Sequence, residues 1–475
     1  MDRIGKAGER CSPAFHYSCS SRYSALGPLP SGMPPKHDCV AHLQELIRFN
    51  TVNPPGNELP LARYVEGVLA GHGIETQLFE PSPLRAALVA RIRGDGSRKP
   101  VLLMAHMDVV GVEREHWSVD PFAGEIRDGY LYGRGAIDDK GMLAANLTAM
   151  LLIAQETREQ ALRLARDVIF VATSDEEASG EWGMGWLIAN HPEAIRAEFA
   201  LNEGGRTRIV GGKPLYLAVQ SAEKVSHVLN ITAHGPGGHA SVPLEGNAVA
   251  RLGRAVAAIH AKPLSMRLLP TTREFFRELS RVWPVARERE AMADVASGDR
   301  ARVQRGARVL REIPALDATL RTTVSPTMLH AGIASNVIPT EASATLNVRT
   351  LPGHAVEDVV ARLTRIVHDP LVDISIVERG EDSPPCPFTS PMFQAIAETT
   401  RNLNPDLAVV PYLGTGATDS ARMRRWGVQT YGILPFPMEQ DDEERMHGND
   451  ERVPISSLEF GTRLIHGAVV RVARA

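Results

Sequence analysis

The sequence predicts an α/β protein in which a domain with a mainly parallel sheet carries an inserted α+β domain. In the N-terminal half, short and almost continuous apolar runs alternate with helical patterns, which is typical of strands buried on both faces of a parallel sheet. From about residue 224 the strands instead alternate polar and apolar residues, as half-exposed strands do. After residue 385 the first pattern returns, and an insertion is the simplest organisation that explains this order.

The first domain is expected to alternate helices with buried strands. Apolar residues at helical spacing predict its helices, and short apolar runs between turn residues predict its strands. In chain order we expect helices over 40–49 and 61–71, strands over 86–92 and 101–106, a helix over 142–155 and a strand over 167–173. The helix over 142–155 is rich in Leu and Met, which indicates core packing.

The second domain is expected to follow the order β-α-β-β-α-β, which is that of a ferredoxin-like unit. The pattern gives a strand over 225–233, a helix over 247–260, strands near 327–331 and 342–349, a helix over 356–367 and a strand over 372–378. An Arg-rich insert over about 264–325 separates the first helix from the second strand. Its charges predict a solvated helical face.

These patterns divide the chain into four segments. Residues 1–36 are rich in Ser, Pro and Gly and are expected to form a disordered leader, or else to reflect a start codon placed too far upstream. The first domain then comprises 37–221 and 383–475, and the second domain comprises 222–382.

The composition excludes several classes of protein. The 475 residues are 43% hydrophobic and 23% charged, and the formal net charge of −4 argues against general nucleic-acid binding. No apolar run approaches the roughly 18 residues that cross a bilayer, so membrane insertion is not expected. The 4 cysteines are too few for a disulfide framework. Since the leader lacks the apolar core of a signal peptide, we expect a cytoplasmic location.

Groups of His, Asp and Glu residues follow the predicted strands of the first domain. They are His106-Met-Asp108, Asp138-Asp139, Glu176-Glu177 and Glu203. Sites in open α/β sheets form beyond the carboxyl ends of the strands, so these side chains are expected to converge. Carboxylates at short range repel one another unless a cation compensates them, and mixed imidazole and carboxylate ligands suit zinc among other divalent metals.

Each group alone also has a plainer interpretation, either a hydrogen-bonded histidine or a pair of solvated loop carboxylates. Their joint occurrence in chain order favours a metal site. Neighbouring residues on an extended segment point in opposite directions, so one of Glu176 and Glu177 could bind metal while the other acts as a base.

Taken together, these motifs resemble those of the M20 metallopeptidases, which include aminoacylase, acetylornithine deacetylase and glutamate carboxypeptidase. The matching stretches are His106-Met-Asp108, Gly135-Ala-Ile-Asp138-Asp139-Lys140-Gly141, Asp175-Glu176-Glu177, Asn202-Glu203-Gly204, Gly235-Pro-Gly-Gly-His239-Ala-Ser241, Ser335-Asn336-Val-Ile-Pro339 and Met446-His447-Gly448. The Asn-Glu-Gly-Gly stretch and the long insert make the sequence most similar to the carboxypeptidase S branch. The resemblance implies a zinc-peptidase catalytic domain and a ferredoxin-like domain that serves as lid and dimerisation module.

The resemblance also implies two zinc ions per subunit, with Co²⁺ or Mn²⁺ as alternatives. Asp138 would bridge the two ions. His106 and Glu203 would complete the ligands of one ion, and Glu177 and His447 those of the other. Many relatives have Asp where Glu203 stands, but both side chains offer the same coordinating group.

Further roles follow from the same resemblance. Glu176 would be the general base for a zinc-activated water, and Asp108 would orient the ring of His106. His239 would stabilise the oxyanion, often in the site of a neighbouring subunit. Candidates for substrate binding are Arg349, which would grip a free carboxylate, together with Asn336 and Thr418. Plainer alternatives stay open for His239 as a turn residue, Arg349 as a solvated strand residue and the loop of Thr418 as a simple turn.

The function implied is hydrolysis of an amide bond in a small peptide or N-acyl amino acid by a homodimer. One alternative is a dipeptidase or a deacylase of small metabolites, of the acetylornithine or succinyl-diaminopimelate type. A more distant alternative is a binding relative without catalysis, although such a protein is expected to lose Glu176 or a metal ligand. No nucleic-acid or membrane partner is expected.

Overall fold

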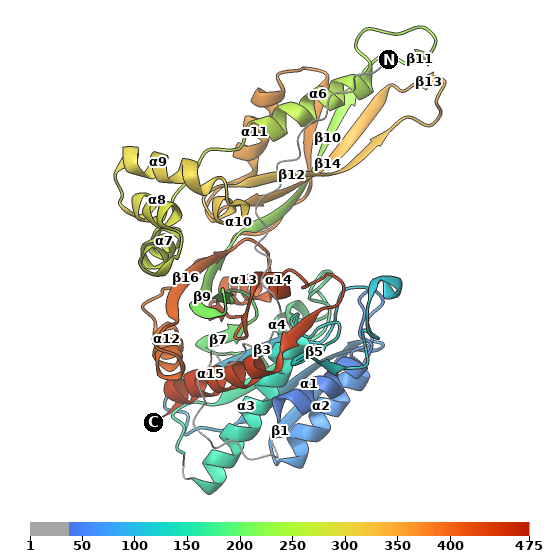
Figure 1. Ribbon diagram of the computed structural model, residues 1–475. Coiled ribbons are helices and arrows are strands. Elements are labelled where there is room, and N and C mark those ends of the chain that lie inside the picture. The colour runs from blue at the N-terminus through green and yellow to red at the C-terminus, as the bar shows by residue number, and fades with distance from the viewer. Residues whose placement is uncertain (1–37, 161, 475) are drawn as a thin grey trace, which may run out of the picture.

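The computed structural model describes residues 38–160 and 162–474, so the leader predicted over 1–36 lies outside the described residues. Figure 1 shows a large body built around an extended sheet and a smaller, elongated body above it. The chain leaves the large body after β9 (Lys213–Glu223) and returns to it after β15 (Val372–Glu378). The mixed α/β architecture with a mostly parallel central sheet confirms the predicted fold class.

The large sheet has 10 strands in the order β1-β2-β6-β3-β7-β17-β9-β8-β18, with β16 paired to β9. Their bounds are β1 Glu75–Ser82, β2 Arg85–Ile92, β3 Val101–His106, β6 Val168–Thr173, β7 Phe199–Asn202, β8 Arg206–Val210, β16 Ala408–Gly414, β17 Gln429–Gly432 and β18 Pro437–Met438. At its centre β3 runs parallel to β6 and β7, and β17 runs parallel to β7. The antiparallel strands β1 and β2 extend one edge.

Helices cover both faces of this sheet, because successive residues of its buried strands point to opposite sides. On one face, Leu103 and Phe170 belong to the core built with α1 (Cys39–Arg48), α2 (Leu59–Gly71), α3 (Lys140–Glu159), α12 (Pro391–Leu403) and α15 (Ile455–Ala473). On the other face, Leu102 and Ile169 pack against α4 (Met184–Asn190), α5 (Pro192–Ile195) and α13 (Asp419–Arg425). Most of α3 is buried, which confirms its predicted role in the core.

The small body is an antiparallel sheet of four strands in the order β12-β14-β10-β15. Its strands are β10 Val225–His234, β12 Thr323–Ala331, β14 Glu341–Thr350 and β15, and its core is closed by α6 (Ala248–Ala261) and α11 (Val356–Val367). This is the predicted ferredoxin-like order. Burial alternates along β10 and β14, because only one face of the sheet meets the helices.

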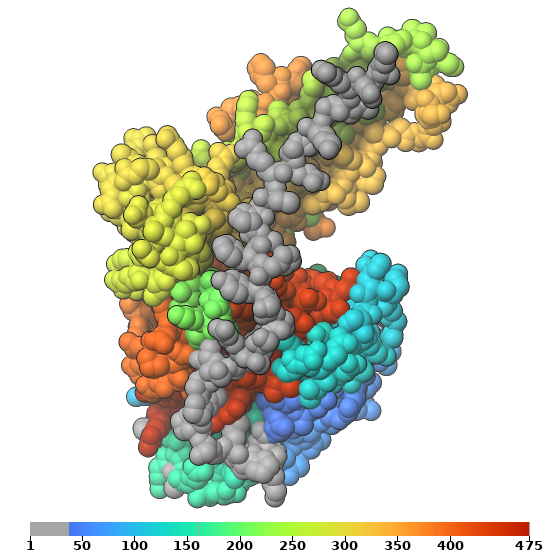
Figure 2. All heavy atoms as spheres, in the orientation of Figure 1, coloured from blue at the N-terminus to red at the C-terminus, as the bar shows by residue number. Residues whose placement is uncertain are grey.

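The Arg-rich insert forms the helices α7 (Pro270–Val282), α8 (Ala286–Ala296), α9 (Arg300–Leu310) and α10 (Pro314–Ala318). Most of its arginines are exposed, as predicted. Its apolar side packs on the large body, where Phe275 and Phe276 share a core with Tyr216 of β9 and Tyr412 of β16. In Figure 2 the yellow insert rests on the large body, while an open space separates the two bodies on the other side. The insert therefore joins the bodies, which the sequence pattern did not predict.

This contact leads to a stability prediction. Phe276 is fully buried. Phe276→Ala is therefore expected to lower the free energy of unfolding by about 3–5 kcal/mol. Denaturant unfolding of the full chain measures the change. Arg308→Ala, at an exposed position of the same insert, is the control and is expected to stay within about 0.5 kcal/mol. Equal, small effects of both substitutions would contradict an anchoring role for the apolar side.

Within 38–160 and 162–474, no helix has the length and apolar character required to cross a membrane. The cytoplasmic location stays a prediction.

Candidate metal centre and substrate pocket

The polar groups that the sequence predicts to converge lie at one edge of the large sheet. His106 is the last residue of β3, Glu176 and Glu177 follow β6, and Glu203 follows β7. These three strands are adjacent and parallel, so their carboxyl ends meet at the same edge. Asp138 approaches the edge from the loop between β5 (Tyr130–Tyr132) and α3, and its peptide bond to Asp139 is cis.

Asp138 lies between the two histidines. Its Oδ1 is 3.0 Å from Nε2 of His106, and its Oδ2 is 3.0 Å from Nε2 of His447. Glu203 Oε1 lies 3.9 Å from the same nitrogen of His106, and Glu177 Oε1 lies 3.3 Å from that of His447. One carboxylate thus separates a His106–Glu203 side from a His447–Glu177 side.

Both glutamates after β6 face this group. Ligand atoms of His106, Glu176 and Glu203 lie within 4.8 Å of one another, and so do those of His106, Asp138 and Glu177. Glu177 therefore lies close to both His106 and His447. Glu176 lies close to His106 and Glu203.

Asp108 connects the loops after β3 and β6. Its Oδ1 accepts the backbone N–H of Glu176 at 3.1 Å, and its Oδ2 accepts that of Glu177 at 3.1 Å and the Asn53 amide at 2.8 Å. The Nδ1 of His106 lies 3.0 Å from the carbonyl oxygen of Asp108 and 3.5 Å from its carboxylate. A proton on Nδ1 leaves the lone pair of Nε2 free for a metal. The carbonyl oxygen of Asp108 thus lies nearer to Nδ1 than its carboxylate does, whereas the resemblance implies that the carboxylate orients the ring.

The electrostatics of the group fit a cation. Burial raises the pKa of Glu203 well above its ordinary value, and the carboxylates of Glu176 and Asp138 raise it further. Burial likewise raises the pKa of Glu176, again with neighbouring carboxylates adding to the effect. Hydrogen bonds to Asp138 and Glu177 raise the pKa of His447 to about 10. Since buried carboxylates repel one another unless a cation compensates them, this donor set is a candidate site for divalent metal.

The sequence reasoning missed a buried ion pair that holds two of the site loops together. Arg134 Nη1 lies 2.7 Å from Oε2 of Glu451, and both side chains are almost fully buried. The Glu451 carboxylate also accepts the backbone N–H groups of Gly135, Ile137 and Asp138. Arg134 Nη2 donates to the carbonyl oxygens of Gly111 and Gly448. The available signal was an arginine between two glycines just before Asp138, whereas nothing in the pattern marked Glu451.

Three other predicted residues lie in the small body and take no part in the hydrogen bonds and ion pairs described above. His239 is exposed on β11 (Gly238–His239), and its Nδ1 lies 2.7 Å from Oγ of Ser241. The carbonyl oxygen of Asn336 accepts the backbone N–H of Ala240. Figure 1 shows β11 and β13 (Val337–Ile338) at the end of the small body that is remote from the large sheet. Arg349 lies on β14, where its Nε donates to Oδ1 of Asn347 at 3.1 Å.

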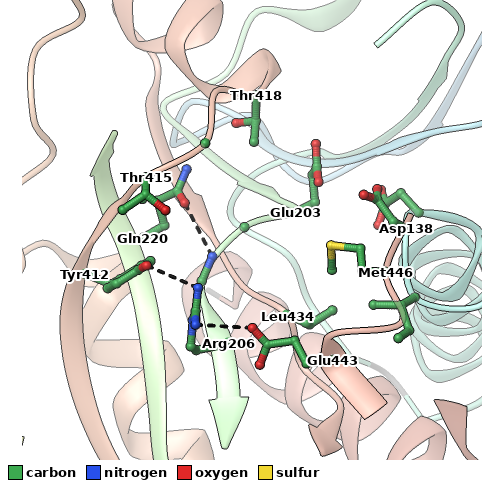
Figure 3. Close-up of a pocket in the computed structure, with 16 residues that line it drawn as sticks. Asp138, Glu203, Arg206, Gln220, Tyr412, Thr415, Thr418, Leu434, Glu443 and Met446 are labelled. Carbon is green, nitrogen blue, oxygen red and sulfur yellow. Dashed lines mark hydrogen bonds and ion pairs between the residues drawn. The ribbon is translucent and has the colours of Figure 1, made fainter. Parts of the chain in front are cut away.

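Thr418 lines a pocket whose inner end is formed by Asp138 and Glu203. The cluster of His106, Asp138, Glu176, Glu177, Glu203 and His447 is called the metal group below. The pocket is lined by Asp138, Glu203, Arg206, Tyr412, Thr418, Glu443 and Met446 among others (Figure 3). The hydroxyl of Thr418 donates to Glu223 at 3.2 Å and accepts the backbone N–H of Ser420 at 3.1 Å, which caps α13. These bonds give the hydroxyl a structural task beside the pocket.

Imidazoles and carboxylates gathered at the edge of an open α/β sheet define the chain as a candidate metallohydrolase. The model described as peptidase family M20/M25/M40 matches residues 102–471, and the chain belongs to this family. It is therefore a hydrolase of the type that acts on peptides or acyl-amino acids.

Two curated proteins and one solved structure illustrate the relationship. The probable carboxypeptidase S-like 2 of Dictyostelium discoideum is 31% identical over 76% of this chain and 70% of its own length. Human N-fatty-acyl-amino acid synthase/hydrolase PM20D1 is 28% identical over 78% of this chain and 74% of its own length. The crystal structure of the M20 family metallo-carboxypeptidase Sso-CP2 from Sulfolobus solfataricus aligns with a TM-score of 0.66 at 18% identity and covers 91% of this chain and 98% of that chain. This last alignment supports the fold.

Proposed function

We propose that the chain is a zinc-dependent hydrolase that cleaves the amide bond of a peptide or N-acyl amino acid with a free carboxylate. The Asp138 carboxylate, which faces His106 and His447 at 3.0 Å on either side, carries the proposal. Such a carboxylate suits a bridge between two cations. His106 and Glu203 would hold one zinc ion, and Glu177 and His447 the other. Co²⁺ or Mn²⁺ would suit the same donors.

In the proposed reaction, Glu176 is the general base. Bound zinc would make a water molecule more acidic and polarise the amide carbonyl. Glu176 takes a proton from the attacking water and passes it to the leaving amine. Burial raises the pKa of Glu176, which helps its carboxyl group to hold the proton between the two steps. Asp108 holds Glu176 in place through the backbone N–H.

His239 is proposed to act in the site of a second subunit. Its position at the remote end of the small body supports this proposal, because the histidine lies far from the metal group of its own chain. The strand β12 is an edge strand of the small sheet and exposes Met328 and Leu329. Exposed apolar edge strands tend to pair with other chains, so β12 is a suitable surface for the proposed homodimer.

Arg349 is the proposed partner of the free carboxylate of the substrate. A guanidinium binds a carboxylate through two parallel hydrogen bonds. Arg349 is partly buried on β14 and has a polar neighbour in Asn347, which orients the side chain. Asn336 would contact the same carboxylate or the oxyanion.

The names of the two curated relatives support substrates of both kinds, peptides with a free C-terminus and N-acyl amino acids. A dipeptidase or a deacylase of small metabolites remains the second candidate, because the metal group and Glu176 would serve these reactions equally.

The test is a screen of the zinc-loaded protein against N-acyl amino acids and dipeptides, before and after chelation. We expect hydrolysis that is lost with the chelator and restored by zinc. We also expect a lower melting temperature after chelation, because ligands that bind only the folded state stabilise it. Hydrolysis that resists complete metal removal would contradict the proposal. Zinc binding without turnover of any substrate would instead favour a binding relative.

A further inference from the structure

The substrate pocket has a metal end and a cationic end. Asp138 and Glu203 line the first, while Arg206, Tyr412 and Glu443 line the second (Figure 3). The cavity volume is about 180 Å³. A short acyl group fits such a space.

Arg206 is the first residue of β8 and is fixed by two neighbours. Its Nη1 lies 3.2 Å from Oε1 of Glu443, and its Nη2 donates to the hydroxyl of Tyr412 at 3.2 Å. The guanidinium carbon also lies 5.2 Å from the centre of the Tyr412 ring. Its Nε–H is buried without a hydrogen-bond partner among the described residues. The guanidinium is therefore held in one place with donor capacity to spare.

The cationic end retains a positive charge. Glu443 also binds Arg208, whose Nη2 lies 2.9 Å from its Oε2. One carboxylate thus faces two guanidinium groups, which leaves one net positive charge beside the hydroxyl of Tyr412. An arginine fork next to a hydroxyl is well suited to a carboxylate.

The direction of the substrate follows from the proposed function, on which this inference rests. The reacting carbonyl must lie at the metal group, and the free α-carboxylate is assigned to Arg349 of the small body. Every residue that lines the pocket belongs to the large body. The part of the substrate on the acyl side of the carbonyl then occupies the pocket and points to Arg206.

We propose that Arg206 selects substrates whose acyl group ends in a carboxylate, such as an N-succinyl amino acid. The second carboxylate of the acyl group meets Arg206 and Tyr412, while the α-carboxylate meets the small body. A neutral acyl group of the same size does not form these charged hydrogen bonds.

Kinetics with matched acyl groups test the proposal. N-succinyl and N-(4-methylpentanoyl) derivatives of one amino acid have nearly the same shape but differ in the terminal carboxylate. We expect a higher kcat/KM for the succinyl substrate in the unchanged protein. Arg206→Met is expected to lower that value by about 10- to 100-fold, as for the loss of a charged hydrogen bond, and so to remove the preference over the 4-methylpentanoyl substrate.

Arg208→Met is the matched control, because Arg208 binds the same Glu443 but does not line the pocket. Because it removes the excess positive charge but no hydrogen-bond donor of the pocket, it is expected to weaken the succinyl preference less than Arg206→Met does. Equal turnover of the two matched substrates by the unchanged protein would overturn the proposal. So would an equal loss for all substrates in Arg206→Met, because Arg206 would then bind the α-carboxylate. The melting temperature reports whether each variant is folded.

A binding measurement separates this inference from the proposed function. Calorimetry with succinate and butanoate on the zinc-loaded protein is expected to show tighter binding of succinate, and Arg206→Met is expected to remove the difference. If no amide is hydrolysed but succinate keeps this Arg206-dependent advantage, the proposed function fails and the carboxylate site stands. If hydrolysis occurs and the two acids bind equally, the carboxylate site fails alone.

Discussion

Replacing Glu176 with glutamine is expected to lower kcat by about 10²- to 10⁴-fold, the usual contribution of a general base. Glutamine keeps the size and polarity of the side chain but cannot accept a proton from water. The backbone N–H at this position still donates to Asp108, so the loop after β6 keeps its place. Steady-state kinetics with the best substrate of the screen measure the effect, and zinc content measured on the same sample is expected to stay unchanged.

Two further variants make this result specific. Glu176→Asp retains a carboxylate and is expected to recover part of the lost rate. Glu181→Gln changes an exposed glutamate in the following loop and is expected to leave kcat unchanged. If Glu176→Gln retains full turnover with its zinc in place, Glu176 has no role as a base.

Replacing Glu451 with alanine is expected to destabilise the chain by about 3–5 kcal/mol, because the substitution leaves Arg134 as an uncompensated buried charge. The loop that carries Asp138 also loses the acceptor of three backbone N–H groups. Arg134 also donates to the carbonyl oxygen of Gly448, next to His447. We therefore expect Asp138 and His447 to be less well positioned and zinc affinity to fall. Denaturant unfolding and zinc titration of the purified variant measure stability and metal affinity separately.

A double-mutant cycle tests the ion pair itself. Arg134→Met combined with Glu451→Gln removes both charges, and the double variant is expected to be more stable than the sum of the single effects implies. Zinc affinity should nevertheless stay low in the double variant, because the hydrogen bonds that position Asp138 need a carboxylate. Additive stability effects together with unchanged zinc affinity would show that the pair does not position the site.

The buried strands and the ferredoxin-like order could be predicted because each strand shows its burial in the pattern of apolar residues along a few neighbouring positions. The apolar run 101–106 became the central strand β3, and the alternation over 225–233 became β10 with one face in the core. The edge strand β1 has a mixed pattern of exposure, so its apolar residues did not stand out. The contact of Phe276 with Tyr216 and Tyr412 joins distant parts of the chain, and no local pattern carries such information.

The convergence of the imidazoles and carboxylates could be predicted because each of these residues ends a recognisable strand or belongs to a compact motif. Parallel strands place their carboxyl ends together, so His106 and Glu203 had to be close. Glu451 was missed because its partners are mostly backbone N–H groups, which leave no mark on the sequence. Arg206 was missed because its place in the pocket depends on contact with Tyr412, which lies far along the chain. The placement of His239 relative to a metal site depends on how the two bodies, and the two subunits of the proposed homodimer, are arranged, which motifs do not specify.

Anomalous diffraction at the zinc absorption edge, recorded from crystals of the zinc-loaded protein, tests the central claim most directly. We predict two peaks separated by about 3.5–4 Å, as in other two-metal sites, both in contact with Asp138. One peak should lie beside His106 and Glu203, and the other beside Glu177 and His447. A single peak remote from Asp138, or no bound zinc at this edge of the sheet, would contradict the account.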